Sequence, residues 1–243
     1  MGTALVLAFL IKTFFLQAFY IPSGSMRPEL QVSDRILVQK VSYWFGAVDR
    51  GDVVVFDDPG GWLGPDLSEG ASNPVTRTLE TIGLYPSGGH IVKRVIGVAG
   101  DEVACADGAL SVNQSVLAEG TYVTLADSSC TGKWRVDVPE DRLWVMGDNR
   151  ANSVDSRAHL GSPGGGFIPV DDVVGRVFVV AWPPKHWAAV TRPSAFAGDS
   201  LDQAAGLVLP GASLGLAWTV VPLARRWSSR SRGRHREEDL RDE

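Results

Sequence analysis

Two long apolar runs, one near each end of the chain, constrain the fold most, because each is long enough to cross a lipid bilayer. Residues 2–21 contain only four polar side chains, and residues 203–224 contain no charged residue. About 20 residues of α-helix, at a rise of about 1.5 Å each, span a hydrocarbon core of about 30 Å. We therefore predict an N-terminal transmembrane anchor over residues 1–20 and a second transmembrane helix over residues 203–224.

Charge predicts which side of the membrane each part of the chain occupies. The second run is followed by six arginines between residues 225 and 236, with no acidic residue among them. By the positive-inside rule, residues 225–243 form a cytoplasmic tail, and the segment between the two runs lies outside the cytoplasm. The prolines and glycines of the second run suit a lipid-embedded helix, and a buried helix of a soluble domain is the alternative.

The first run differs from a typical anchor at Lys12, which falls near its centre. A charge there costs about 2.5–3.5 kcal/mol on insertion scales, unless the side chain snorkels to the interface. A cleavable secretory signal is the alternative, but no basic residue precedes the run and no small-x-small site precedes Tyr20. We therefore expect an uncleaved anchor.

Between the two runs the pattern is that of short β-strands. Runs rich in valine and isoleucine are bounded by glycine, proline and aspartate, and no helical pattern of 12 or more residues is evident. We predict an all-β ectodomain over residues 21–185, in a barrel-like or sandwich arrangement of folded-over sheets. The predicted strands are Arg35–Val41, Asp52–Phe56, Ile91–Val98, Val103–Ala104, Ala109–Val112, Leu143–Met146 and Val173–Ala181.

Three segments fall outside this strand pattern. Residues 57–89 hold seven glycines and four prolines, which predicts a mobile insertion with one short helix at residues 78–84. Residues 161–166 are a second, shorter glycine-rich loop. Residues 186–202 are expected to be a linker that leads to the second transmembrane helix.

Composition narrows the possible chemistry. Acidic residues outnumber basic ones by 23 to 15 between residues 22 and 202, which disfavours a nucleic-acid partner. The four histidines are scattered and no paired-cysteine motif occurs, so we expect no metal and no other cofactor. Outside the cytoplasm, Cys105 and Cys130 are expected to form a disulfide worth about 3 kcal/mol, and two unpaired buried thiols are the alternative.

Three polar clusters carry candidate chemistry. Ser23 and Ser25 lie in a Gly/Pro-rich turn directly after the first apolar run, where a hydroxyl nucleophile would sit beside backbone N–H donors. Lys93, one of only five lysines, lies in an apolar strand, where burial would lower the pKa of the amine and suit it to act as a general base. Residues 146–157 form a dense polar loop with two Asp/Arg pairings.

Each cluster also has an ordinary structural explanation. The serine turn could equally be a polar loop that follows a membrane segment. Lys93 could be an edge-strand residue whose charge prevents aggregation, and the polar loop could be ordinary solvated surface. A GxSxG match at residues 211–215 lies inside the second apolar run with no strand before it, so we do not interpret it as a nucleophile site.

Together, the clusters resemble the bacterial type I signal peptidases, which are membrane-anchored Ser/Lys proteases that remove signal peptides from exported proteins. The resemblance runs from about Leu5 to Pro184 and implies the folded β-sheets shared with LexA-like self-cleaving repressors. The C-terminal apolar run and the arginine-rich composition look like the actinobacterial branch of the family. Four motifs carry the resemblance, in the family's order: Pro22-Ser23-Gly24-Ser25-Met26, Arg50–Phe56, Lys93–Asp101 and Gly147–Arg157.

The resemblance implies roles for individual residues. Ser25 corresponds to the nucleophile and Lys93 to the general base. Ser23 would bind the oxyanion together with the Ser25 N–H, and Ser153 would orient the Lys93 amine. The supporting residues of the polar loop are Asp148, Arg150, Asp155 and Arg157, the last two as an ion pair. The residues that correspond to shallow pockets for small side chains at the first and third positions before the cut are Phe19, Ile21, Pro22, Met26, Leu30, Ile36, Val55, Ile91 and Val92.

The same resemblance implies substrates and a location. The substrates would be preproteins with small-x-small cleavage sites, met at the outer surface of the plasma membrane, in contact with lipid and with the secretion translocon. Three alternatives remain open at this point. They are a soluble self-cleaving repressor, a non-enzymatic membrane-anchored β domain, and a peptidase of this family that is dedicated to a single precursor.

Overall fold

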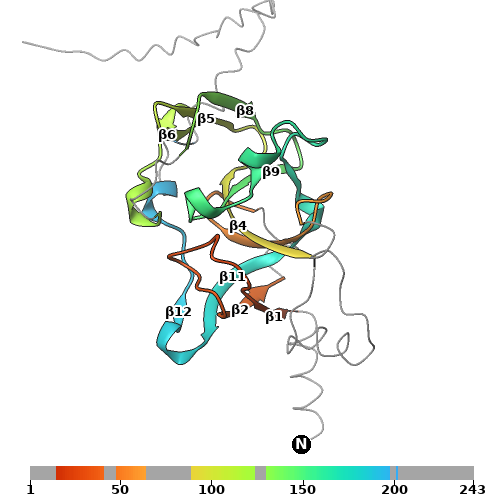
Figure 1. Cartoon of the computed structure of the whole chain (residues 1–243), viewed down its shortest axis with the longest axis vertical. Helices are drawn as coiled ribbons and strands as arrows, with labels where there is room; N and C mark the ends of the chain where they lie inside the picture. The colour runs from red at the N-terminus through yellow and green to blue at the C-terminus, as the bar shows by residue number, and fades with distance from the viewer. Residues whose placement is uncertain (1–14, 41–47, 64–88, 124–129, 198–200, 202–243) are drawn as a thin grey trace, which may run out of the picture. The chain divides into compact units, whose positions relative to one another are not determined.

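The computed structural model describes residues 15–40, 48–63, 89–123, 130–197 and 201, coloured in Figure 1. These residues form twelve β-strands and six short 3-10 helices, and no α-helix occurs among them. The strands make two antiparallel sheets, so the all-β prediction is confirmed for this part of the chain.

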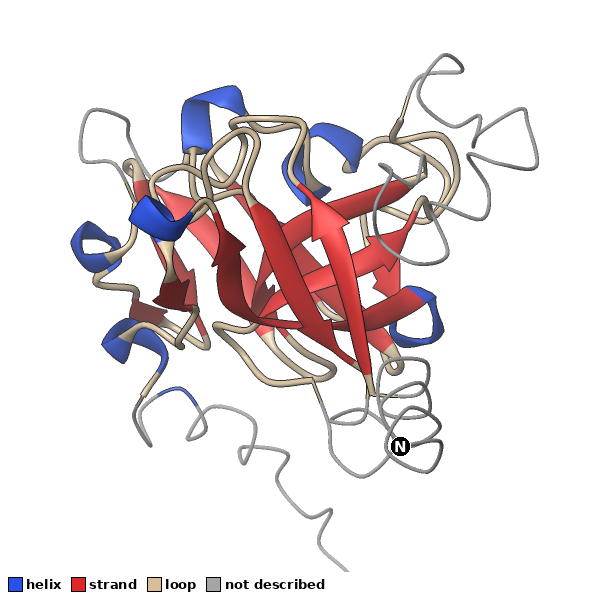
Figure 2. Ribbon diagram, turned by 90° about the horizontal axis from the view of Figure 1, so that it is seen from below, coloured by secondary structure: helices blue, strands red, loops and turns tan. Residues whose placement is uncertain are grey.

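The larger sheet contains eight strands in the order β1-β2-β11-β3-β4-β9-β10, with β12 paired to β11. Figure 2 shows the strands of the structure in red and the short helices in blue. Although β1 and β4 are far apart in this order, the rings of Phe19 on β1 and His90 on β4 lie 5.2 Å apart. Register shifts along β11 and β4 bend the sheet and allow this approach. The bounds are β1 Leu16–Tyr20, β2 Arg35–Gln39, β3 Val53–Asp57, β4 His90–Gly97, β9 Arg142–Met146, β10 Ile168–Pro169, β11 Val173–Trp182 and β12 Ala188–Ala189.

The smaller sheet has four strands in the order β7-β6-β5-β8. Its strands are β5 Glu102–Ala106, β6 Ala109–Val112, β7 Ser115–Val116 and β8 Trp134–Asp137. Buried and half-buried side chains alternate along β6 and most of β5, and half-buried and exposed side chains alternate along β7 and β8. Such alternation is typical of a sheet with one face in a core and one face toward solvent. The 3-10 helices are η1 Glu119–Thr121, η2 Arg150–Asn152, η3 Ser156–His159, η4 Val170–Asp172, η5 Pro184–His186 and η6 Ser194–Phe196.

Two apolar clusters lie on opposite faces of β4. β4 is buried along nearly its whole length because side chains from both faces pack against other elements. We call the two groups cluster A and cluster B. The buried members of cluster A are Phe19, Ile21, Met26, Leu30, Ile36, Val38, Val53, Val55, Val177 and Val180, with Val92 packed against them. Those of cluster B are Val48, Val54, Phe56, Ile91, Val95, Leu143, Val145 and Ile168, with Trp62 and Leu63 packed against them.

The predicted N-terminal anchor ends too late in the sequence. Residues 16–20, assigned to the anchor, form β1 and pair with β2. An apolar segment that enters a protein core has the same composition as the end of a membrane helix, so hydropathy does not separate the two. Among the described residues, no helix is long and apolar enough to cross a membrane. Residues 1–14 and the predicted second span at 203–224 lie outside the described residues.

The predicted linker at residues 186–202 is also corrected by the structure. Its described part packs on the β domain, where Arg192 pairs with the buried carboxylate of Asp52 and Leu201 is 3% exposed. The Leu201 carbonyl accepts a hydrogen bond from the Asn113 side chain. The β domain therefore extends beyond residue 185. The predicted short helix at 78–84 and the GxSxG match at 211–215 lie outside the described residues.

A disulfide joins Cys105 at the end of the smaller sheet to Cys130, as predicted. The Cα atoms are 6.0 Å apart, a separation typical of disulfides. The loop that it closes contains η1, whose side chains reach the polar loop described below.

Removing this disulfide should lower the free energy of unfolding by about 3 kcal/mol, because the cross-link spans 25 residues and restricts the unfolded chain. Urea unfolding in detergent of the wild type and of the Cys105→Ser/Cys130→Ser double variant measures the difference. A reductant should reproduce the loss in the wild type and leave the double variant unchanged. Equal unfolding midpoints for the two oxidised proteins would contradict this expectation.

Candidate active site

A cleft of about 470 Å³ opens between β1, the start of β4 and the turn that follows β1. Its lining combines apolar side chains with three polar residues that the sequence had singled out, namely Ser23, Ser25 and Lys93. These three residues come from two segments that are far apart in the chain, and the folded-over course of the larger sheet brings them together.

The amine of Lys93 lies within hydrogen-bonding distance of the Ser25 hydroxyl. Lys93 Nζ donates to Ser25 Oγ at 2.8 Å across 68 residues of sequence, and Ser23 Oγ lies 3.3 Å from Ser25 Oγ. Both partners of the first hydrogen bond are buried, since Ser25 is 8% and Lys93 5% exposed. A nucleophile and a base within direct reach of each other form the arrangement required for covalent catalysis.

Strand β4 carries Lys93 into this buried position. Lys93 pairs with Val54 of β3 on one side, and pairing with β9 on the other side begins only at Arg94. Burial lowers the pKa of Lys93 from 10.5 to about 8; the carboxylates of Asp155 and Asp148 raise it, and Arg157 lowers it. The amine is therefore much closer to its neutral form at physiological pH than a solvated lysine.

Backbone hydrogen bonds fix the turn that holds Ser25. The Ile21 N–H donates to the Asp34 carbonyl and the Ser33 N–H donates to the Ile21 carbonyl, which tie the entrance of the turn to the start of β2. Met26, 1% exposed, anchors the other side of Ser25 in cluster A. The hydroxyl is thus presented by a segment with little freedom to move.

Asn149 binds the same turn from the polar loop. Its backbone N–H donates to the Ser25 carbonyl at 3.0 Å, and its side-chain amide donates to the Gly24 carbonyl at 3.0 Å. Asn149 lies within the motif Gly147–Arg157, but the sequence predicted no role for it. Only the fold shows that it holds the nucleophile turn.

Asp155 organises the polar loop after β9. Its carboxylate accepts hydrogen bonds from the Gly147 N–H at 3.0 Å and from the Arg157 side chain at 2.9 and 2.8 Å. Burial alone would raise the pKa of Asp155, but its hydrogen bonds to Arg157 and Gly147 and the Arg157 charge hold the pKa below its usual value. The predicted ion pair is therefore present, and it supports the loop that packs on Ser25.

The backbone at Gly147 lies directly against the nucleophile turn. A Cβ atom at this position would lie 2.5 Å from the Ser25 carbonyl oxygen and 2.6 Å from Ser153 Cβ. Ser153 therefore borders the site through Gly147. Because the hydrogen bond of the Lys93 amine goes to Ser25, the orienting role of Ser153 stays a prediction.

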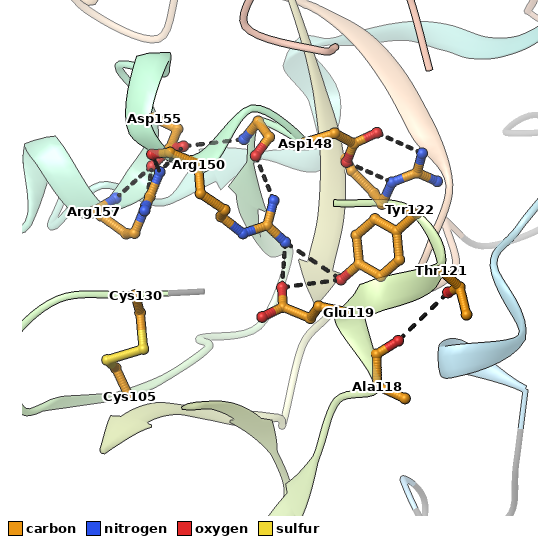
Figure 3. A network of polar contacts seen from close by, with 12 residues as sticks. Cys105, Ala118, Glu119, Thr121, Tyr122, Cys130, Asp148, Arg150, Asp155 and Arg157 are labelled. Atoms are coloured by element: carbon orange, nitrogen blue, oxygen red, sulfur yellow. Dashed lines mark hydrogen bonds and ion pairs between the residues drawn. A yellow bond between two sulfur atoms is a disulfide. The ribbon is translucent and has the colours of Figure 1, made fainter. Parts of the chain in front are cut away.

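A buried ionic network extends from this loop to η1, which lies between β7 and β8 (Figure 3). Arg94 donates two hydrogen bonds to Asp148, at 2.8 and 2.7 Å. Arg150 donates to the Gly147 carbonyl and forms an ion pair with Glu119 of η1. The Tyr122 ring lies 5.0 Å from the Arg94 guanidinium. The sequence offered no signal for Glu119 or Tyr122, because both are ordinary residues of a loop between short strands.

Most of the residues predicted to form substrate pockets lie together. Those that line the cleft are Phe19, Ile21, Pro22, Met26, Ile91 and Val92. Leu30, Ile36 and Val55 are fully buried in cluster A beneath it. Ile91 belongs to cluster B, on the opposite face of β4 from Val92. The predicted set thus divides between two walls of one cleft and the core behind one of them.

Among the described residues, no group of three or more histidine, cysteine, aspartate or glutamate side chains is arranged to hold a metal ion. The polar side chains that line the cleft include the hydroxyls of Ser23 and Ser25, the amine of Lys93, the imidazole of His90 and the amide of Asn152. The nearby carboxylates of Asp148 and Asp155 are engaged by arginines. The chemistry that these groups can perform is acyl transfer by a hydroxyl nucleophile and an amine base.

Comparison with known proteins identifies the family. Residues 1–182 match the family described as signal peptidase, peptidase S26. The chain is 38% identical over 218 residues to a probable signal peptidase I of Mycobacterium leprae, with 77% of this chain and 75% of that protein covered. It is 40% identical over 211 residues to a signal peptidase I of Mycobacterium tuberculosis, with 77% and 72% covered. A solved signal peptidase I from Enterococcus faecalis is 24% identical, with a TM-score of 0.34 over 54% of this chain and 96% of that one.

The chain therefore belongs to the signal peptidase I family of serine peptidases and removes signal peptides from secreted preproteins. Members of this family are typically membrane-anchored. The two mycobacterial relatives agree with the actinobacterial resemblance seen in the sequence.

Substituting Gly147 by alanine should lower preprotein cleavage at least tenfold, because the new Cβ would displace the Ser25 carbonyl or Ser153. The matched control is Gly161→Ala, where a Cβ would meet no atom within 4 Å. Initial rates on a purified preprotein and melting temperatures of both variants measure the effect. Wild-type cleavage by Gly147→Ala would show that the close approach does not matter for catalysis.

Proposed function

We propose that Ser25 is the nucleophile and Lys93 the general base of this signal peptidase, and that the enzyme cuts after small-x-small sites. The observation that carries the proposal is the 2.8 Å hydrogen bond between Lys93 Nζ and Ser25 Oγ inside a buried cleft. The lowered pKa of Lys93, about 8, supports the role of its amine as a base near neutral pH.

The reaction begins when neutral Lys93 takes the hydroxyl proton of Ser25 and Oγ attacks the carbonyl carbon of the scissile peptide bond. The protonated amine then gives the proton to the departing amine of the mature protein, which leaves an ester on Ser25. A water molecule, deprotonated by Lys93, attacks this ester and releases the signal peptide. Lys93 and Ser25 return to their initial protonation states.

The negative charge that develops on the carbonyl oxygen needs hydrogen-bond donors at a fixed position. The Ser25 backbone N–H and the Ser23 hydroxyl are the proposed donors. Ser23 Oγ lies 3.3 Å from the attacking oxygen, so it is adjacent to the reacting carbonyl. Donors that are already in place before the reaction stabilise the transition state more than the substrate.

The cleft can hold the substrate as an extended strand. Within the described residues, β1 pairs only with β2, and the residues of β4 before Arg94 pair only with β3. Both strands therefore offer unpaired backbone groups toward the cleft, which an extended peptide can use by strand addition. Side chains of such a peptide alternate, so every second one points to cluster A. We propose that the tightly packed residues of this cluster leave room only for small side chains before the cut.

We further propose that the ectodomain works at the outer surface of the plasma membrane, close to lipid and to the secretion translocon. The support is the apolar sequence of residues 2–15, which immediately precedes β1. Ser25 lies five residues beyond the end of β1 at Tyr20, so at about 3.3 Å per residue it stays within about 20 Å of the end of that strand. A signal peptide that leaves the bilayer would reach it there.

Ser25→Ala and Lys93→Ala should each reduce cleavage by about a thousandfold or more, because either change removes one half of the dyad. A purified preprotein with an Ala-x-Ala site, cleaved in detergent, is the substrate, and circular dichroism checks the fold. Ser162→Ala and Lys185→Ala, at exposed positions away from the cleft, are the matched controls. Retained activity of Lys93→Ala would refute the assignment of the base.

The pH dependence should report the neutral fraction of Lys93. Because the base acts when deprotonated, kcat/KM should rise about tenfold per pH unit below pH 8 and level off above it, given the pKa of about 8. Single-turnover cleavage between pH 5.5 and 9.5 measures the profile. A rate that is constant from pH 6 to pH 8 would rule out a base with this pKa.

A further inference from the structure

The cleft has a second apolar wall, of which the predicted pockets include only Ile91. Trp62 and Leu63 line the cleft, although both lie in the segment that the sequence suggested was only a glycine- and proline-rich insertion. They lie five and six residues beyond the end of β3 and pack against cluster B. Val154, 61% exposed, and Asn152 contribute to the lining from the polar loop.

One carboxylate holds the backbone that presents Trp62. The side chain of Asp58 accepts hydrogen bonds from four N–H groups, those of Gly60 at 3.2 Å, Gly61 at 3.0 Å, Trp62 at 2.8 Å and Leu63 at 3.2 Å. Burial alone would raise the pKa of Asp58, but these donors lower it on balance. The turn therefore keeps an ionised carboxylate at its centre and a defined backbone course.

Two rings from other elements fix the indole. The imidazole of His159 stacks on it, with centroids 4.4 Å apart and an interplanar angle of 9°. The ring of Phe56, at the end of β3, meets it edge to face at 6.0 Å and 88°. Trp62 is half-buried, so part of its surface stays open to the cleft. An aromatic side chain held in this way can bind an apolar group at little entropic cost.

Alternation along β4 assigns the two walls to different substrate positions. The Val92 side chain packs on cluster A, whereas Ile91 packs in cluster B with Trp62 and Leu63. The cleft extends from Ser25 and Lys93 toward His90, so a substrate strand beside β4 places its residues before the cut along Val92, Ile91 and His90 in turn. Its first and third residues before the cut then face cluster A, and the second faces Trp62.

We propose that Trp62, with Leu63 and Val154, binds the side chain at the second position before the cut and selects large apolar or aromatic residues there. This inference rests on the proposed function, because it takes Ser25 and Lys93 as the point of cleavage. The middle residue of a small-x-small site would then be selected by the enzyme. The selection depends on apolar area buried against the indole, so it increases with the size of the side chain.

The test uses preproteins that differ only at the second position before the cut, with phenylalanine, leucine, glycine or aspartate there. The full-length wild type should cleave the phenylalanine and leucine substrates with at least tenfold higher kcat/KM than the glycine substrate. In Trp62→Ala this ratio should fall to about two, and in Trp62→Phe, which keeps an aromatic face, it should stay above five. Trp187→Ala, a change at a 74% exposed tryptophan that does not line the cleft, should keep the wild-type ratio.

Two outcomes would overturn the inference. One is a wild type that cleaves all four substrates with similar kcat/KM. The other is a Trp62→Ala variant that loses activity equally on every substrate and keeps the wild-type ratio, which would show that the indole only supports the fold. Ser25→Ala, assayed on the same substrates, separates these outcomes from a failure of the proposed function, since its retained activity would refute the dyad whatever the ratios are.

Discussion

The burial of the Lys93 amine is the constraint on which the rest of the site depends. Lowering its pKa from 10.5 to about 8 means that burial destabilises the protonated amine by about 3 kcal/mol relative to the neutral amine. Other interactions of the fold must offset this cost. The two carboxylates that act against this shift, Asp148 and Asp155, are each paired with an arginine. An unpaired carboxylate at either position would raise the pKa further and keep the amine protonated. The apolar strand and the ion pairs thus both help to keep the pKa of Lys93 low.

The ionic network places three segments relative to one another. Buried ion pairs contribute little net stability, because desolvation offsets their attraction, but they are sensitive to geometry. Arg150 connects η1 of the disulfide-closed loop to the backbone at Gly147, and Gly147 and Asn149 contact the turn that carries Ser25. The disulfide-closed loop is therefore connected to the nucleophile turn through a short series of contacts.

Sequence patterns predicted the strands well where an apolar run is bounded by turn residues. Ala109–Val112 is found as predicted, β4 is shifted by one residue at each end, and β11 is one residue longer at its C-terminal end. The prediction was wrong at Leu16–Tyr20, where a core strand continues the apolar run of the anchor, and at residues 186–202, where packing partners are distant in sequence. Strands as short as β7 and β12 carry too few residues for a pattern.

The sequence by itself determined the family and the residue types of the site, because the serine turn, the lysine strand and the polar loop are each a local motif. Only the tertiary structure decided how they meet, since Ser25 and Lys93 are 68 residues apart and their contact depends on the curvature of the larger sheet. The fold alone also placed Glu119 in the ionic network and Trp62 opposite cluster A. The sequence gives no local pattern for Glu119 or Trp62, because each contacts residues that are distant in the chain.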